Sequence, residues 1–171
     1  MDEFVFKVIL LGEKATGKTS LIRRYVHGSF EGRYAGTIGL NVSNKKIEID
    51  KTVVNLLIYD IEAESDFESL FEPFTEGSVA ALFVYDVTRL ETLHAVDNWV
   101  KRLNSVTENL SLKNTILIGN KIDLPRTVEH QLGEKTAEDL KLHVYLETSA
   151  KNDENVDIAF LTLAKNILEN V

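Results

Sequence analysis

Residues 12–19 of the chain have the types and spacing needed to bind phosphate groups. They read Gly-Glu-Lys-Ala-Thr-Gly-Lys-Thr, which fits the pattern G-x-x-x-x-G-K-[ST]. Glycines let such a loop curl closely around phosphates, and its successive peptide N–H groups supply positive potential to bind them. Lys18 would reach the β- and γ-phosphates, and the Thr19 hydroxyl would coordinate Mg²⁺. The motif therefore predicts a purine nucleotide, bound with Mg²⁺, as the working ligand.

A second motif, N-K-I-D at residues 120–123, follows directly on an apolar run and is suited to reading a base. Its side chains are expected at the carboxyl end of a strand, where ligands bind in open α/β sheets. The Asp123 carboxylate can accept hydrogen bonds from guanine N1–H and N2–H₂, whereas adenine would leave it unpaired. A third segment, E-T-S-A-K at 147–151, ends the next strand, and a peptide N–H near Ala150 could donate to guanine O6. Together the motifs predict a guanine site.

The elements that must position these motifs follow from hydrophobic periodicity. Apolar runs of strand length occupy residues 4–11, 79–87, 115–119 and 144–148, and residues 41–49 and 52–61 are strand-like stretches. Helical spacing occupies 18–26, 93–106, 129–142 and 156–168. Asp50 and Lys51 form a polar pair short enough for a hairpin turn, which predicts one antiparallel strand pair. The alternation of the other runs predicts an α/β fold with a mostly parallel sheet.

Length and composition limit what else the chain could be. Its 171 residues predict a single domain spanning 1–171. Apolar residues make up 44% and charged residues 27%, the balance of a globular rather than a disordered chain. The net charge of −8 offers no basic field for nucleic acid, and the absence of cysteine excludes disulfides and thiolate metal sites. Small ligands or proteins are therefore the expected partners.

The sequence shows no membrane-inserting segment or lipidation signal. No apolar run approaches the roughly 20 residues needed to span a bilayer. Residue 2 is Asp rather than the glycine of a myristoylation signal, and no cysteine is present for prenylation. We expect a cytoplasmic monomer with no membrane anchor of its own, which would reach a membrane only through a partner or a C-terminal tail absent from this chain.

The motifs occur in the order found in Ras-like small GTPases, and the chain resembles the Rab branch most. The resemblance runs from Phe4 to about Leu168 and rests on GEKATGKTSLIRRY, TIG, the Tyr59-Asp60 strand end, NKID and ETSAK. It implies the three-layer fold of a P-loop NTPase, with a six-stranded, mostly parallel sheet, one antiparallel edge strand and five helices. It also implies a GTP/GDP switch in signalling or vesicle traffic. Effectors, exchange factors and GTPase-activating proteins would bind through two switch segments.

The resemblance also assigns roles by motif position. Phe30 would pack on the guanine, Tyr34 would cover the phosphates, and Thr37 in the first switch would bind Mg²⁺ and the γ-phosphate. The implied nucleotide-binding residues are Lys14, Ala15, Thr16, Gly17, Lys18, Thr19, Ser20, Phe30, Tyr34, Thr37, Ala63, Asn120, Lys121, Asp123, Leu124, Ser149, Ala150 and Lys151. The implied metal ligands are Thr19, Thr37 and Asp60, with Asp60 acting through water, and the implied catalytic residues are Lys18, Thr37 and Glu64.

The second switch departs from the family pattern D-x-A-G-Q, because this chain has Ala63 and Glu64 at its last two positions. Ala63 lacks the conformational freedom of glycine. A carboxylate at Glu64 cannot donate a hydrogen bond as an amide does, and its charge opposes the charge that grows on the phosphoryl oxygens. We expect slow or partner-dependent GTP hydrolysis, although a glutamate acting as a base would reverse that sign. A GTP-binding scaffold with negligible hydrolysis is the alternative, and NKID disfavours a P-loop kinase.

Two other departures leave alternatives open. Lys14 either extends over the γ-phosphate as an internal cation, where it would obstruct a partner's arginine finger, or lies in solvent. The second switch is acidic, with Glu62, Glu64, Asp66, Glu68, Glu72 and Glu76. This run is either a solvated loop and helix or a surface for a basic partner.

Overall fold

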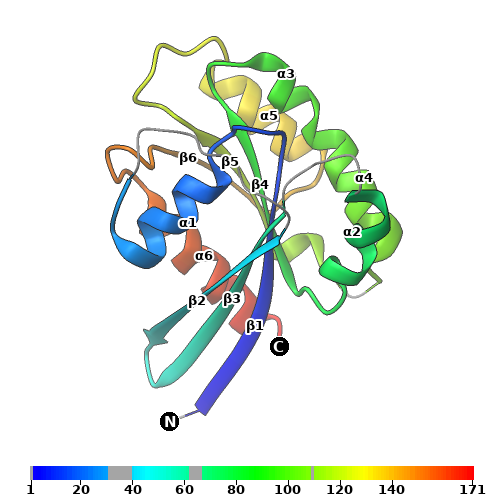
Figure 1. The fold of residues 1–171 in the computed structure, drawn as a ribbon, viewed down its shortest axis with the longest axis vertical. Helices are drawn as coiled ribbons and strands as arrows, with labels where there is room; N and C mark the ends of the chain where they lie inside the picture. The colour runs from blue at the N-terminus through cyan, green and yellow to red at the C-terminus, as the bar shows by residue number, and fades with distance from the viewer. Residues whose placement is uncertain (1, 31–39, 62–66, 109) are drawn as a thin grey trace.

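The computed structural model describes residues 2–30, 40–61, 67–108 and 110–171, and its centre is a six-stranded sheet (Figure 1). The strands are β1 (Asp2–Leu11), β2 (Leu40–Ile49), β3 (Thr52–Ile61), β4 (Ala80–Asp86), β5 (Thr115–Asn120) and β6 (Val144–Thr148). They are ordered β2-β3-β1-β4-β5-β6 across the sheet. This set of strands confirms the predicted α/β class.

Strand direction agrees with the prediction. β2 pairs antiparallel with β3 at one edge, and every other neighbouring pair is parallel. Ile49 pairs with Thr52 across the predicted turn, where Asp50 adopts a positive φ of 55°. Because β1, β4, β5 and β6 run in the same direction, the loops that follow them emerge at one end of the sheet.

Helices cover both faces of the sheet and produce three layers. They are α1 (Lys18–His27), α2 (Phe67–Thr75), α3 (Leu90–His94), α4 (Val96–Val106), α5 (His130–Asp139) and α6 (Val156–Glu169), with a short 3₁₀ turn, η1 (Leu112–Asn114). Only Ala95 separates α3 from α4, and helical hydrogen bonds run into and out of it. With α3 and α4 counted as one unit, the described residues contain five helices, the number that the resemblance implied.

Three helices differ from the periodicity. The predicted helix 93–106 begins three residues earlier, at Leu90. The predicted helix 129–142 ends at Asp139, because Lys141 turns into the left-handed region with a φ of 58°. α2 was not among the helices predicted from periodicity. It contains Pro73, which lacks the N–H needed for the helical hydrogen bond, and a proline in a sequence indicates the end of a helix.

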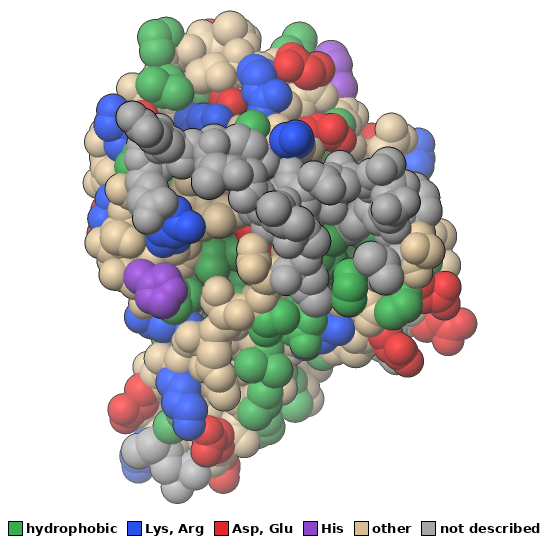
Figure 2. Space-filling model, viewed as in Figure 1, with side chains coloured by type: hydrophobic (Ala, Val, Ile, Leu, Met, Phe, Trp, Pro, Cys, Tyr) green, Lys and Arg blue, Asp and Glu red, His purple; other side chains and the backbone are tan. Residues whose placement is uncertain are grey.

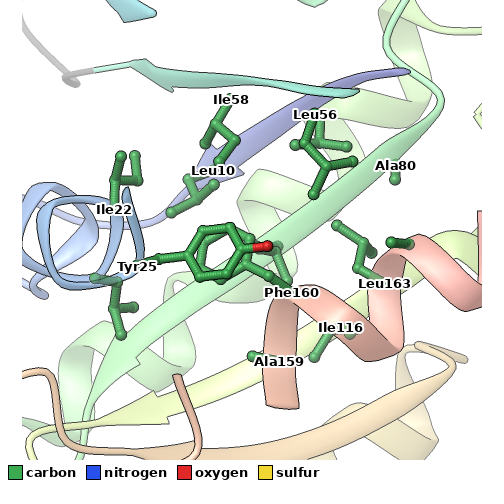
Figure 3. Close-up of a cluster of buried hydrophobic side chains, with 14 of the residues drawn as sticks. Leu10, Ile22, Tyr25, Leu56, Ile58, Ala80, Ile116, Ala159, Phe160 and Leu163 are labelled. Carbon is green, nitrogen blue, oxygen red and sulfur yellow. The ribbon is translucent and has the colours of Figure 1, made fainter. Parts of the chain in front are cut away.

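Each face of the sheet has its own apolar core. On the α1 and α6 side, the rings of Tyr25 and Phe160 stack with centroids 4.1 Å apart, against Leu10 and Ile58 from the sheet (Figure 3). The apolar stripe of α6, which includes Phe160, is buried. On the other face, Trp99 is buried against α2 and the sheet. Among the described helices, none is both long and apolar enough to cross a membrane.

Candidate functional site

The three predicted motifs meet at the carboxyl end of the sheet around one cavity of about 330 Å³. The loop after β1, the loop after β5 and the loop after β6 each contribute to its wall. The residues that line it are Ala15, Gly17, Ser20, Phe30, Asn120, Lys121, Asp123, Leu124, Ala150 and Lys151. All of them belong to the set that the sequence analysis singled out.

The loop of residues 12–17 turns its peptide carbonyls toward donors of the protein. The donors are Lys18 Nζ for the carbonyls of residues 12 and 13 (3.0 Å each), Arg89 Nη2 for 14 (2.9 Å), Lys121 Nζ for 15 (2.7 Å), Asn120 Nδ2 for 16 (3.0 Å) and Leu21 N for 17 (2.9 Å). A loop whose carbonyls are all occupied in this way keeps negative partial charge away from its concave side.

The amide groups of the same loop remain available. Within the described part of the chain, the peptide N–H groups of Lys14, Ala15 and Gly17 donate no hydrogen bond. Ala15 and Gly17 have positive φ angles of 61° and 100°, the kind of conformation that makes successive N–H groups point into one concavity. Helix α1 begins immediately afterwards, at Lys18, and adds the positive end of its dipole. This arrangement is able to bind an anion.

Thr19 and Asp60 provide hard oxygen atoms beside this loop. Asp60 lies near the end of β3 with only 1% of its surface exposed, and its Oδ2 accepts a hydrogen bond from the Thr19 hydroxyl. A hydroxyl and a buried carboxylate at contact distance are the oxygen donors that Mg²⁺ prefers. These two residues therefore fit the predicted metal, and Thr37, the third predicted ligand, lies outside the described residues.

The side chains of the base motif are fixed by hydrogen bonds from the third motif. Ser149 is fully buried, and its hydroxyl donates to Asp123 Oδ1 at 2.7 Å. Thr148 donates to Asn120 Oδ1 at 2.9 Å, while the Nδ2 of Asn120 reaches back to the phosphate loop. Asn120 therefore joins all three motifs, and Ser149 sets the orientation of the Asp123 carboxylate.

Glu147, at the start of the third motif, lies outside the cavity and anchors the segment that follows the base motif. Its carboxylate accepts hydrogen bonds from Arg126 Nη2 at 2.7 Å, from Tyr145 at 2.9 Å and pairs with His130 Nδ1 at 2.9 Å. Burial alone would raise the pKa of Glu147, but the Arg126 bond and the other two bonds outweigh it and keep the pKa below its usual range. The charged carboxylate thus holds residues 126–130 on β6.

Comparison with known proteins agrees with this geometry. A model of the Ras family matches residues 7–169. The Ras-related protein Rab7 of Glycine max is 38% identical, over 97% of this chain and 84% of its own length. The Ras-related protein Rab-30 of Homo sapiens is 34% identical, over 97% and 81%, and the GTP-binding protein YPT1 of Saccharomyces cerevisiae is 33% identical, over 99% and 82%.

The chain belongs to the Ras family of small GTPases. Its Rab-named relatives confirm the predicted likeness to the Rab branch. Members of the Ras family generally bind GTP and GDP with Mg²⁺ and interact with effectors, exchange factors and GTPase-activating proteins.

Several predicted site residues of this Ras-family chain are not part of the described site. Tyr34, Thr37, Ala63 and Glu64 lie outside the described residues, as do Glu62 and Asp66, and the side chain of Glu68 is not described either. Lys14 is described and exposed, and it does not line the cavity. Thr16 and Lys18 are buried beneath the loop, where they hold carbonyls of residues 12 and 13.

Asp86 is a residue beside this site that sequence reasoning missed. It ends β4, is only 2% exposed, and pairs with Lys121 Nζ at 3.0 Å and with Arg89 Nε at 3.2 Å. Those two cations are the donors to the carbonyls of Ala15 and Lys14. A single aspartate after an apolar run gives no such signal in a sequence, because an ordinary turn would look the same.

Arg24 is a second missed residue and has the same kind of role. From α1, its Nε donates to the carbonyl of Ala150 at 2.8 Å and its Nη2 to that of Lys151 at 3.0 Å. The guanidinium thereby ties the third motif to the helix that begins at the phosphate loop. The contact spans 126 residues of sequence, so no local pattern reveals it.

We expect Asp86→Asn to destabilise the protein at neutral pH by about 1–3 kcal/mol, because Lys121 and Arg89 lose their buried counter-ion. Burial would raise the pKa of Asp86, but hydrogen bonds from Thr88 and the Lys121 ion pair hold it below its ordinary value of 3.8. Asp86 therefore binds a proton more readily in the unfolded chain than in the folded one. The stabilisation by the Asp86 carboxylate is present above pH 3.8, the pKa in the unfolded chain, and is lost as the pH falls through the pKa in the folded protein.

Urea unfolding of wild type and Asp86→Asn across this pH range measures the effect. The two free energies of unfolding should differ near neutral pH and converge in acid. Asp97→Asn, which removes an exposed carboxylate paired with Lys101, is the control and should cost about 0.5 kcal/mol or less. A constant difference between wild type and Asp86→Asn at every pH would contradict the assignment.

Proposed function

We propose that this Ras-family protein is a guanine-nucleotide switch that binds GTP or GDP with Mg²⁺ and hydrolyses GTP slowly or with the help of a partner. The observation that carries the proposal is the convergence of the phosphate loop, Asp123 and Ala150 on one cavity of about 330 Å³. Such a cavity, with an anion-binding loop at one end and a fixed carboxylate at the other, suits a nucleotide.

The phosphate end would bind the charged tail of the nucleotide. The peptide N–H groups of residues 14–17 would donate to the β-phosphate, and the Lys18 ammonium, now bonded to two loop carbonyls, would reach the β- and γ-phosphates. Thr19 and Asp60 would hold Mg²⁺, the latter through water. When bound, the metal supplies positive charge that offsets the charge developing on the transferred phosphoryl group.

The other end would select guanine. Asp123 has its Oδ1 fixed by Ser149 at 2.7 Å, which aims the carboxylate for two hydrogen bonds from guanine N1–H and N2–H₂. The Lys121 side chain crosses the cavity wall to the carbonyl of Ala15, so its alkyl stem can lie along one face of the base. Phe30, which is 36% exposed at the cavity, would pack on the base.

The carboxylate of Glu64 is the main reason to expect slow hydrolysis. A glutamine can both accept from the attacking water and donate to the phosphoryl oxygens, whereas a carboxylate only accepts and adds a negative charge. Ala63 adds steric cost wherever a positive φ is needed. The alternative function, a GTP-binding scaffold with negligible hydrolysis, is supported by the same two residues.

We expect Glu64→Gln to accelerate hydrolysis of bound GTP by about 10- to 100-fold, because the amide supplies a donor where negative charge develops. Single-turnover hydrolysis of preloaded GTP by purified wild type and variant measures the rate. Glu91→Gln, on α3, changes an exposed glutamate away from the cavity and serves as the control. A wild type that is already fast and is slowed by Glu64→Gln would instead make Glu64 a general base.

The nucleotide recovered with the purified protein separates the two functions. GDP on the protein supports a working enzyme, whereas stable GTP supports the scaffold. Neither guanine nucleotide, with no binding on addition of GTP, would refute both.

Partners would bind at the two switch segments, and the second switch has an acidic continuation on α2. Figure 2 shows acidic side chains at the edge of the molecule where α2 lies. Glu72 and Glu76 are exposed there and, together with Glu108, line a separate cavity of about 390 Å³. We propose that effectors, exchange factors or activating proteins with basic surfaces bind here. A cytoplasmic location, with membrane association through a partner or through a C-terminal tail, accords with this role.

A further inference from the structure

The only tryptophan of the chain is hydrogen-bonded to the phosphate loop. Trp99 lies in α4, is 3% exposed, and donates from its Nε1 to Glu13 Oε1 at 3.0 Å across 86 residues of sequence. A buried indole N–H needs an acceptor, and a carboxylate makes the bond charge-assisted. A phenylalanine at this position would lack the bond to Glu13, so the indole nitrogen adds a contact that apolar packing does not supply.

Glu13 passes this constraint to Lys18. Its carbonyl accepts hydrogen bonds from Thr16 Oγ1 and from Lys18 Nζ, both at 3.0 Å. One residue is therefore held at its side chain by α4 and at its backbone by the two groups beneath the loop. A displacement of Glu13 would move the carbonyl that orients the Lys18 ammonium.

Trp99 is in turn packed against α2. The Phe71 ring of α2 lies 6.3 Å from the Trp99 ring, centroid to centroid, at an interplanar angle of 45°. The Arg102 guanidinium lies over both rings, 4.7 Å from the Phe71 centroid and 4.9 Å from that of Trp99. This shared cation–π contact binds the two helices where the indole is oriented toward Glu13.

We propose that Trp99 is a positioning residue that transmits the position of α2 to the phosphate loop. Phe71 and Arg102 orient the indole, the indole holds Glu13, and Glu13 holds the ammonium of Lys18. A shift of α2 that separates Phe71 from Trp99 therefore weakens the binding of the phosphates by Lys18. This inference rests on the proposed nucleotide binding, because the relay acts on how tightly the phosphate loop holds the nucleotide.

A double-mutant cycle with Trp99→Phe and Glu13→Ala tests the relay in the full chain loaded with a fluorescent GDP analogue. Each single variant should release the analogue about tenfold faster than wild type, as expected for loss of a charge-assisted hydrogen bond. The double variant should be no faster than either single variant, because both remove the same bond. Glu91→Ala, on the exposed side of α3, should release at the wild-type rate.

Two further variants separate a relay from simple core packing. Phe71→Leu retains apolar volume but loses the ring, so it should accelerate release in the wild-type background and have no additional effect in Trp99→Phe. Glu13→Gln keeps an acceptor and should restore most of the retention that Glu13→Ala loses. Because Trp99 is the sole tryptophan, the tryptophan fluorescence of the protein is sensitive to the hydrogen bond between Trp99 and Glu13. Emission should change on removal of nucleotide from wild type but not from Glu13→Ala.

The outcomes are distinct. Wild-type release rates in both single variants, or additive effects in the double variant, would overturn the relay while leaving nucleotide binding intact. Binding of no guanine nucleotide by the wild type would overturn the proposed function and the relay together. Thermal unfolding of each variant shows whether faster release accompanies loss of the fold, and Glu13→Ala, outside the helices, keeps the test open if Trp99→Phe does not fold.

Discussion

Asp123→Ala should abolish the preference for GTP over ATP. The two hydrogen bonds from guanine N1–H and N2–H₂ to a carboxylate contribute about 1.5–3 kcal/mol each, so we expect the GTP affinity to fall by about 10²- to 10⁴-fold. ATP affinity should change little, because adenine offers neither donor. We expect a large effect because Ser149 fixes Oδ1, so the carboxylate would need no reorganisation to bind the base.

Calorimetry with GTP and with ATP, each in the presence of Mg²⁺, measures both affinities. Asp139→Ala, which removes an exposed carboxylate paired with Lys135, is the matched control and should leave both unchanged. Ser149→Ala should give a smaller loss of GTP affinity, because it only frees the carboxylate to rotate. Equal binding of ATP and GTP by the wild type, or an unchanged preference in Asp123→Ala, would refute guanine selection by this residue.

Gly17→Ala should have the largest effect on the whole site. Gly17 has a φ of 100°, and a Cβ there would lie 2.2 Å from Asn120 Nδ2. The methyl group would expel the amide that holds the carbonyl of Thr16 and that links the three motifs. We expect nucleotide affinity to fall by at least about 100-fold and the free energy of unfolding by roughly 2–4 kcal/mol, because backbone strain and a steric clash add.

Gly77→Ala provides a control that separates strain from clash. Gly77 also has a positive φ, of 76°, but a Cβ there would meet nothing within 4 Å. It should therefore cost only about 1 kcal/mol from the left-handed conformation and leave nucleotide binding intact. Equilibrium unfolding and nucleotide titration of both variants make the comparison. Wild-type affinity in Gly17→Ala would show that the contact with Asn120 is not needed.

Local patterns were sufficient to predict the sheet and the motif positions. β1, β4, β5 and β6 overlap apolar runs, since buried parallel strands need apolar side chains on both faces. β2 and β3 overlap the strand-like stretches 41–49 and 52–61 on either side of the predicted turn. The phosphate loop could also be predicted from the sequence, because glycines at fixed spacing and a following lysine reflect a local backbone conformation and not a distant contact. The helix bounds were less predictable: Pro73 obscured α2, and the left-handed Lys141 ended α5 early.

The members of the candidate site could be predicted, and the contacts that hold them could not. The residues that line the cavity were all named in advance, some from the motifs and others, such as Phe30, from the family resemblance. Asp86, Arg24 and the bond from Trp99 to Glu13 were not, since each joins a motif to a residue dozens of positions away or to an unremarkable strand end. Only folding brings such groups within hydrogen-bond distance. The sequence thus indicated which residues line the cavity, and the tertiary structure decided which contacts hold them in place, because those contacts join groups far apart in the chain.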